Sequence, residues 1–382
     1  MDRRSLLIGL MALAVPQVAC QQSAANALQI AAIKDILPPQ VLSDLKQTLA
    51  ATPLRLRTQR TAADLFQQLQ VWHGAIAPTE SEAGAASARA DWVCLSDYWL
   101  WGAIQQQLIS PLTGLDALPG WAALPKRWGP PLRRDAQGFW AAEPTTWATP
   151  YRWGQLMMVY SQRQFDRLGW QPTTWQDLLR PELQGRIALP DHPRLVLGLL
   201  LKALGYSAND RTPAAHADLT EAIAALRPQV KLYASDNYLQ PLIMEDIALA
   251  VGWSTEVRPV LSRYRQLQAV TPDPGTLLTA DVWVKPNPTR TAPPAVAVTP
   301  VDQQWLSYWW QPEVVAPLSL FSQGLSPALL SPARLRQPLG FDSATVYLPT
   351  AAQVANSEFI EPLPETAIAA YRDLWLTLRR GE

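Results

Sequence analysis

Apolar residues occur along this chain in two kinds of pattern. Continuous blocks of strand length stand at 28–33 (LQIAAI), 155–160 (QLMMVY) and 277–284 (LLTADVWV), as expected for strands buried on both faces. Stretches such as 62–72 and 365–380 instead return apolar residues every three or four positions, which indicates helices with one buried side. This alternation predicts an α/β protein whose mainly parallel sheets are flanked by helices.

Two series of alternating elements follow from the pattern, one on each side of an irregular region. Residues 111–148 show no period and are rich in Pro, Trp and Gly, so we expect loops and short helical turns there. Before this region the expected strands are 28–33, 54–57 and 91–95, and the expected helices are 38–49, 62–72 and 97–109. After it the expected strands are 155–160, 186–189, 231–233, 247–253, 267–270 and 277–284, and the main expected helices are 215–226, 256–266, 303–310 and 365–380.

Turn-forming residues fix several boundaries in the second series. Thr174, with Asp177 three residues later, has the form of a capping box at a helix start. A further helix is expected to begin with Asp191 as its cap and Pro193 in its first turn, where a missing N–H is tolerated. Gly205 is expected to end that helix in a left-handed conformation.

The size and charge of the chain restrict its class. Its 382 residues are enough for two domains, and 48% hydrophobic with 17% charged residues indicate a globular protein. Lys plus Arg and Asp plus Glu number 32 each, so the chain lacks the basic excess typical of nucleic-acid binding. The three histidines are not spaced as metal ligands, and no nucleophile-elbow or P-loop motif occurs, so we expect neither a cofactor nor a catalytic site.

The first 27 residues read as an export signal followed by a short linker. Arg3 and Arg4 precede an apolar run at 6–15, which is shorter than the ~20 residues that span a bilayer. The arginine pair followed by Ser-Leu-Leu resembles a twin-arginine signal, so both general and twin-arginine export stay open.

Two processing sites compete within this signal. Residues 18–20 (VAC) resemble the end of a lipobox with Cys20 as the lipidated residue, although Gln17 replaces the usual Leu. Residues 25–27 (ANA) would instead release a soluble protein. We favour a periplasmic protein that is anchored to the membrane through Cys20, because the only other cysteine, Cys94, lies in a strand pattern and is expected to be a buried thiol.

Several motifs occur in a specific order along the chain. PYRWG (150–154), WQDLLRPELQGRIALPDHPR (175–194) and LKALGYS (201–207) together resemble the hinge and second lobe of bacterial periplasmic spermidine/putrescine-binding proteins. Those proteins are the substrate-binding components of ABC importers. LSDYW (95–99) and YASDNYLQPLIMEDIALAVGWS (233–254) are similar in the same order, so the resemblance covers nearly the whole chain after the signal.

This resemblance implies a two-lobed periplasmic binding protein of type II, with a ligand cleft between two α/β lobes. We expect residues 28–154 and 280–330 to form the first lobe, and residues 155–279 and 331–382 to form the second. The implied protein is a monomer that captures a polyamine-like amine and delivers it to an ABC permease in the inner membrane. The alternatives are a different small solute, a sensory or scaffold role without transport, and a periplasmic enzyme.

The resemblance also implies a set of ligand-binding residues. In polyamine-binding relatives, carboxylates hold the ammonium groups and aromatic rings pack on the methylene chain, which uses charge-assisted hydrogen bonds and cation–π attraction. The matching positions in this chain are Asp35, Ser96, Tyr98, Trp253 and Asp281. The first strand departs from the pattern, because the aromatic residues that usually flank its carboxylate are absent around Asp35.

A second departure concerns charge. At the start of the second-lobe helix, relatives carry two carboxylates where this chain has His192 and Leu195, and Lys34 adds a positive charge near the first strand. His192 is therefore a further candidate ligand-binding residue in a site that is less anionic than a spermidine site. We expect a diamine or another less charged amine to bind in preference to spermidine, through Asp281.

Overall fold

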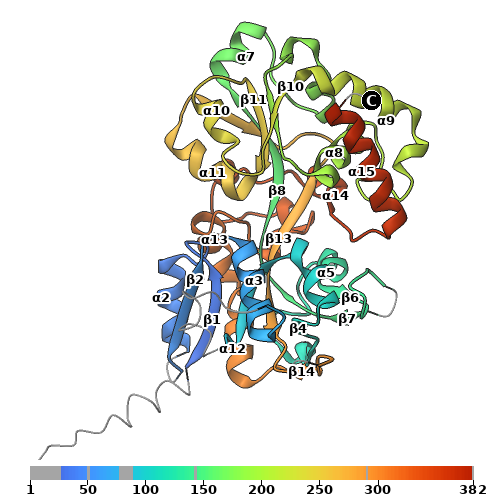
Figure 1. Cartoon of the computed structure of the whole chain (residues 1–382). Helices are drawn as coiled ribbons and strands as arrows, with labels where there is room; N and C mark the ends of the chain where they lie inside the picture. The colour runs from blue at the N-terminus through green and yellow to red at the C-terminus, as the bar shows by residue number, and fades with distance from the viewer. Residues whose placement is uncertain (1–26, 50–51, 77–88, 142–143, 290, 381–382) are drawn as a thin grey trace, which may run out of the picture.

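The computed structural model describes residues 27–49, 52–76, 89–141, 144–289 and 291–380. These residues form two lobes, one above the other, joined by two long strands that run through both (Figure 1). The strands are β8 (Thr149–Ser161) and β13 (Leu277–Pro286). Residues 1–26, with the lipidation site at Cys20, lie outside the described residues, and Ala27 is the only described residue of the alternative cleavage site.

The lower lobe contains the N-terminal elements and the segment that follows β13. Its strands are β1 (Leu28–Ile33), β2 (Leu54–Gln59), β3 (Trp92–Ser96), β4 (Ile109–Ser110), β5 (Leu112–Thr113), β6 (Arg133–Arg134), β7 (Thr145–Thr146) and β14 (Val296–Ala297). Its helices are α2 (Pro39–Thr48), α3 (Ala62–His73), α5 (Asp97–Gln105), α6 (Gly129–Leu132), α12 (Pro300–Tyr308) and α13 (Pro312–Phe321).

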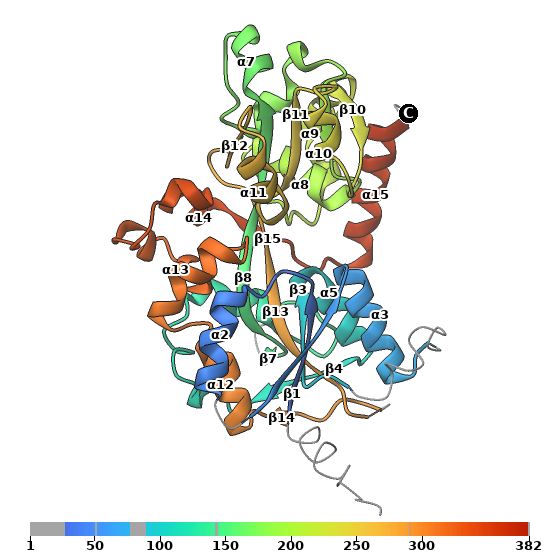
Figure 2. The ribbon, with the colours of Figure 1, turned by 90° about the vertical axis from the view of Figure 1, so that its left-hand side faces the viewer.

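The upper lobe is built from the segment between the two long strands and from the C-terminal helix. Its strands are β9 (Ile187–Leu189), β10 (Val230–Tyr233), β11 (Leu249–Trp253) and β12 (Leu267–Val270). Its helices are α7 (Gln162–Leu168), α8 (Pro193–Ala203), α9 (Ala217–Leu226), α10 (Leu239–Ile243), α11 (Ser254–Arg263) and α15 (Glu365–Arg380). Between the lobes lie α14 (Ala351–Asn356) and β15 (Glu358–Phe359), which is parallel to β13 (Figure 2).

The main sheet has the strand order β10-β9-β11-β8-β13-β3-β1-β2. The outer pairs are parallel, as β1 with β2 and β9 with β10, whereas β8 and β13 are antiparallel to their neighbours in this order. The sequence predicted one sheet in each lobe. Because the two long strands pair with each other, hydrogen bonding continues from one lobe into the other, and their register places Asp281 directly opposite Arg152.

Each lobe has its own hydrophobic core on the two faces of the sheet. Aromatic residues of α12 fill one face of the lower lobe, where Trp283 of β13 lies 5.0 Å from Trp305, measured between ring centroids. The segment 331–359, which the sequence assigned with the second lobe, places Val354 and Phe359 in the lower-lobe core. Helix α15 packs instead on the upper lobe through Tyr371 and its neighbours.

The predicted boundaries differ from the observed ones at two places that shape the site. The helix expected to reach residue 109 ends at Gln105, because the chain turns there to form β4. Helix α8 is capped by His192 rather than by Asp191, since the Nδ1 atom of His192 accepts a hydrogen bond from the backbone N–H of Leu195. The capping box of Thr174 and Asp177 is confirmed, on a short 3-10 helix.

Candidate ligand-binding cavity

A cavity of about 510 Å³ lies between the lobes and is lined by residues from both of them. The lower-lobe wall comes from the ends of β2 and β3 and from the middle of β13. The upper-lobe wall comes from the start of α8, residues 234–238 and the β11–α11 junction. Strand ends and helix starts meet here because both halves of the main sheet direct these ends toward the gap between the lobes. Such a gap is the usual place for a ligand in α/β folds.

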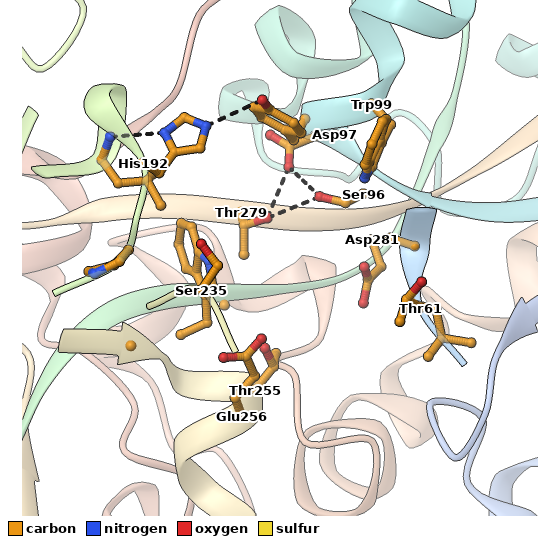
Figure 3. Close-up of a pocket in the computed structure, with 18 of the residues that line it drawn as sticks. Thr61, Ser96, Asp97, Trp99, His192, Ser235, Thr255, Glu256, Thr279 and Asp281 are labelled. Carbon is orange, nitrogen blue, oxygen red and sulfur yellow. Dashed lines mark hydrogen bonds between the residues drawn. The ribbon is translucent and has the colours of Figure 1, made fainter. Parts of the chain in front are cut away.

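The structure brings together five of the six predicted binding residues. The cavity lining includes Ser96, Tyr98, His192, Trp253 and Asp281. Figure 3 shows Ser96, His192 and Asp281 reaching the cavity from different elements, with His192 and Asp281 on opposite sides of the view.

Asp35 is the exception, because it is not among the residues that line the cavity. It is exposed and adopts a left-handed backbone with φ of 66° directly after β1. The neighbouring Ile33 and Ile36 reach the cavity instead. Lys34, which was expected to reduce the negative charge of the site, is also exposed and outside the lining.

Asp281 is held by an arginine that sequence reasoning did not connect with the site. Its Oδ2 atom lies 2.5 Å from Nε of Arg152, and the two side chains are only 16% and 7% exposed. Arg152 also donates a hydrogen bond to the backbone carbonyl of Ser322. Its side chain packs on Gly324, where a Cβ atom would come within 2.6 Å of the arginine Cδ. The positive charge beside Asp281 is therefore built into the fold.

Two further carboxylates reach the cavity from the upper lobe, Glu256 at the start of α11 and Asp236 in the loop between β10 and α10. Glu256 accepts a hydrogen bond of 2.5 Å from the hydroxyl of Tyr238. Enclosure by the cleft walls raises the pKa of Glu256, and the nearby Asp236 raises it further. The signal that could have found Glu256 is its position three residues after Trp253, within the first turn of a helix that starts at the cleft.

Another carboxylate of the lining, Asp97, is almost fully buried and has a structural role. Its Oδ1 atom accepts hydrogen bonds from the backbone N–H of Ala280 at 3.0 Å and from the hydroxyl of Thr279 at 3.1 Å. Burial raises the pKa of Asp97 to about 6, against the lowering effect of these hydrogen bonds and of Arg134. Asp97 thus joins β13 to the start of α5 and fixes Ser96 and Tyr98 beside the cavity.

Aromatic side chains line both walls of the cavity. Tyr98 is 58% exposed, and Trp99 and Trp253 are partly buried, so their faces are available to a methylene chain or a cation. The Tyr98 hydroxyl lies 3.3 Å from Nε2 of His192, which makes a direct polar contact between the lobes. Burial and the nearby Arg194 lower the pKa of His192, so this ring is neutral near pH 7.

These residues suit a small organic cation better than a metal ion. Among the described residues, no group of His, Cys, Asp and Glu side chains could hold a metal. The lining instead combines aromatic faces with the carboxylates Asp236 and Glu256, in addition to the Arg152–Asp281 pair. Carboxylates and aromatic rings together recognise ammonium groups through charge-assisted hydrogen bonds and cation–π attraction.

Comparison with known proteins places this cleft in a family. A family model for bacterial extracellular solute-binding proteins matches residues 93–339, which is more than half of the chain. The chain belongs to this family. The coarse expectation of a solute-binding protein is therefore confirmed, and the lining residues 96–99, 152–154, 278, 279 and 281 all fall within the matched region.

Relatives of this solute-binding protein include named polyamine-binding proteins. It is 29% identical over 111 residues to a putrescine/cadaverine-binding protein of Pseudomonas aeruginosa, a match that covers 28% of this chain and 31% of the relative. It is 23% identical over 209 residues to the spermidine/putrescine-binding periplasmic protein of Escherichia coli, which covers 55% of this chain and 57% of that protein. The chain thus spans about a third to just over half of the length of these relatives.

Solved structures confirm the two-lobed fold expected for this solute-binding protein. A spermidine/putrescine ABC transporter substrate-binding protein from Streptococcus pneumoniae superposes with a TM-score of 0.72 at 20% identity, over 93% of this chain and 98% of that one. A glycerophosphocholine complex of UgpB from Mycobacterium tuberculosis gives a TM-score of 0.64 at 12% identity, over 93% and 94% of the two chains. Since the fold is shared by proteins with different ligands, the ligand must be argued from the cavity.

Proposed function

We propose that this protein is the extracellular solute-binding component of an ABC importer and captures a small organic amine between its lobes. The proposal is supported chiefly by the cavity, whose lining combines the carboxylates of Asp236 and Glu256 with aromatic residues from both lobes. Three relatives with matching segments have names that include putrescine or spermidine. The amine would pass from this cleft to a permease in the inner membrane.

In this proposal the ammonium group is held mainly by Glu256. Its carboxylate is positioned by the Tyr238 hydroxyl and accessible from the cavity, and a second negative charge at Asp236 lies close by. Trp253 and Tyr98 pack on the methylene chain. Asp281 is a proposed contact through its Oδ1 atom only, because its Oδ2 atom and its charge are engaged by Arg152. Ser96 and His192 complete the polar lining.

Calorimetric titration of residues 28–382 with 1,4-diaminobutane tests this function. We expect binding, and we expect Glu256→Gln to weaken it about tenfold or more, because a charge-assisted hydrogen bond is lost. Glu182→Gln is the matched control, since Glu182 is exposed outside the cavity and its replacement should leave affinity unchanged. If no aliphatic amine binds at millimolar concentration, the proposed ligand class is wrong.

We also propose that the mature protein is periplasmic and anchored through a lipid on Cys20. The support is the lipobox-like sequence at 18–20 after a short apolar run. Cys20→Ser should move the protein from the membrane fraction to the soluble periplasmic fraction. Identical fractionation of both forms would favour cleavage after Ala27. No described helix has the length and apolar character needed to cross a membrane.

A further inference from the structure

The cavity has two ends of opposite charge, and this difference restricts the ligand further. Figure 3 shows Asp281 and Thr61 on one side of the cavity and Ser235 and Glu256 on the other. The inference rests on the proposed function, because it assumes that an amine binds at Glu256.

Two carboxylates line the cavity at the Asp281 side, and each has an arginine beside it. Arg152 is paired with Asp281 at 2.5 Å, and the opposed positions of these residues on β13 and β8 fix the pair. The other carboxylate on this side, Asp97, also lines the cavity but is 5% exposed, and the positive charge of the buried Arg134 offsets its negative charge. Arg152 thus stands where a second ammonium group of the ligand would otherwise be held.

The same side carries a further positive charge that has no partner. Arg60 lines the cavity next to Thr61, at the loop between β2 and α3. Within the part of the chain that the structure describes, Arg60 forms neither an ion pair nor a hydrogen bond. Asp64, the nearest acidic residue in sequence, accepts hydrogen bonds from the backbone of Thr61 in the capping box of α3. The side therefore has a net charge of about +1.

The opposite side has a net negative charge. Glu256 and Asp236 both line the cavity there, and they are close enough for Asp236 to raise the pKa of Glu256. The nearest basic candidate, His192, is neutral near pH 7 because burial and Arg194 lower its pKa. Arg194 itself is buried and donates hydrogen bonds to Asn209 and to the carbonyl of Glu361, away from the cavity lining.

We propose that the ligand is an ω-amino acid, with a primary ammonium group at Glu256 and a carboxylate at Arg60. A diamine would place its second ammonium group beside two arginines, Arg60 and Arg152. That arrangement is unfavourable because like charges in a partly enclosed cleft repel strongly. The carboxylate of an amino acid instead gives Arg60 the partner that it lacks. Arg60 and Arg152 are in this view the residues that determine specificity.

The test is calorimetric titration of residues 28–382 with 4-aminobutanoate, 5-aminopentanoate and 6-aminohexanoate, each beside the diamine of the same chain length. We expect at least one amino acid to bind about tenfold more tightly than its diamine. Arg60→Gln should weaken binding of the amino acid about tenfold and strengthen binding of the diamine, and Arg60→Glu should reverse the preference. Arg55→Gln, an exposed arginine outside the cavity, is the matched control and should change neither.

The outcomes separate this inference from the proposed function. If diamines bind through Glu256 more tightly than every amino acid, the inference is wrong and the amine-binding function stands. If Arg60→Gln weakens both ligand classes equally, Arg60 does not select the carboxylate and the inference is again wrong. If neither class binds, the proposed function fails with it.

Discussion

The Arg152–Asp281 pair provides the sharpest prediction about how this cleft is built. Arg152→Met keeps most of the volume of the side chain and removes its charge. The variant leaves the Asp281 carboxylate without its partner in a site where the aspartate side chain is only 16% exposed, and it leaves the Ser322 carbonyl without its donor. Breaking a buried ion pair by removing one partner costs about 3 kcal/mol or more in free energy of unfolding.

The complementary change is expected to be milder. Asp281→Asn retains an oxygen that can accept the Nε–H of Arg152, but it leaves the guanidinium uncompensated near a second buried arginine, Arg258. We expect the free energy of unfolding to fall by about 2 kcal/mol. In the double variant neither charge remains, so its loss should not exceed that of Arg152→Met alone. The coupling energy between the two positions is then about 2 kcal/mol.

Urea unfolding of residues 28–382, followed by tryptophan fluorescence and circular dichroism, measures these differences. The slope of the free energy against urea concentration should be the same in all four proteins, so that midpoints can be compared directly. Additive losses in the double variant would refute the reasoning. They would mean that Asp281 is not held by Arg152 in solution and is available as a ligand carboxylate, which would also remove one support for the ω-amino acid.

Two further predictions concern residues around the cavity. Gly252→Ala places a Cβ atom within 2.2 Å of the Tyr238 hydroxyl, so it should displace Tyr238 from Glu256, weaken amine binding and lower the free energy of unfolding by about 2 kcal/mol. The control is Gly129→Ala, whose added Cβ meets no atom within 4 Å and should change neither binding nor stability. Burial raises the pKa of Asp97 from 3.8 to about 6, so the folded state binds this proton more tightly than the unfolded state does and stability should fall as pH rises across that interval. At pH 8 the free energy of unfolding of Asp97→Asn should therefore exceed that of wild type by about 2 kcal/mol, whereas at pH 4 it should not. Equal differences at both pH values would contradict the assigned pKa.

Much of the fold follows from local sequence signals. The apolar blocks at 28–33, 155–160 and 277–284 became β1, β8 and β13, because continuous apolar residues can be covered on both faces only inside a sheet flanked by helices. The capping box at Thr174 and the left-handed Gly205 appeared where the residue types require them. The sequence also placed five of six candidate residues at the cleft, since strand ends on both sides face it.

The charge of the cavity, in contrast, was decided only by tertiary structure. Arg152 and Asp281 are 129 positions apart, and nothing near either residue shows that the register of β8 against β13 sets them opposite each other. Likewise Glu256 becomes a cavity carboxylate through a hydrogen bond from Tyr238, while Asp35 turns away from the cavity in a left-handed turn. Local patterns determine which segments form strands and helices, because they depend on neighbours a few residues apart. The pairing of charges depends on how distant segments align, which a single sequence does not encode in any local pattern.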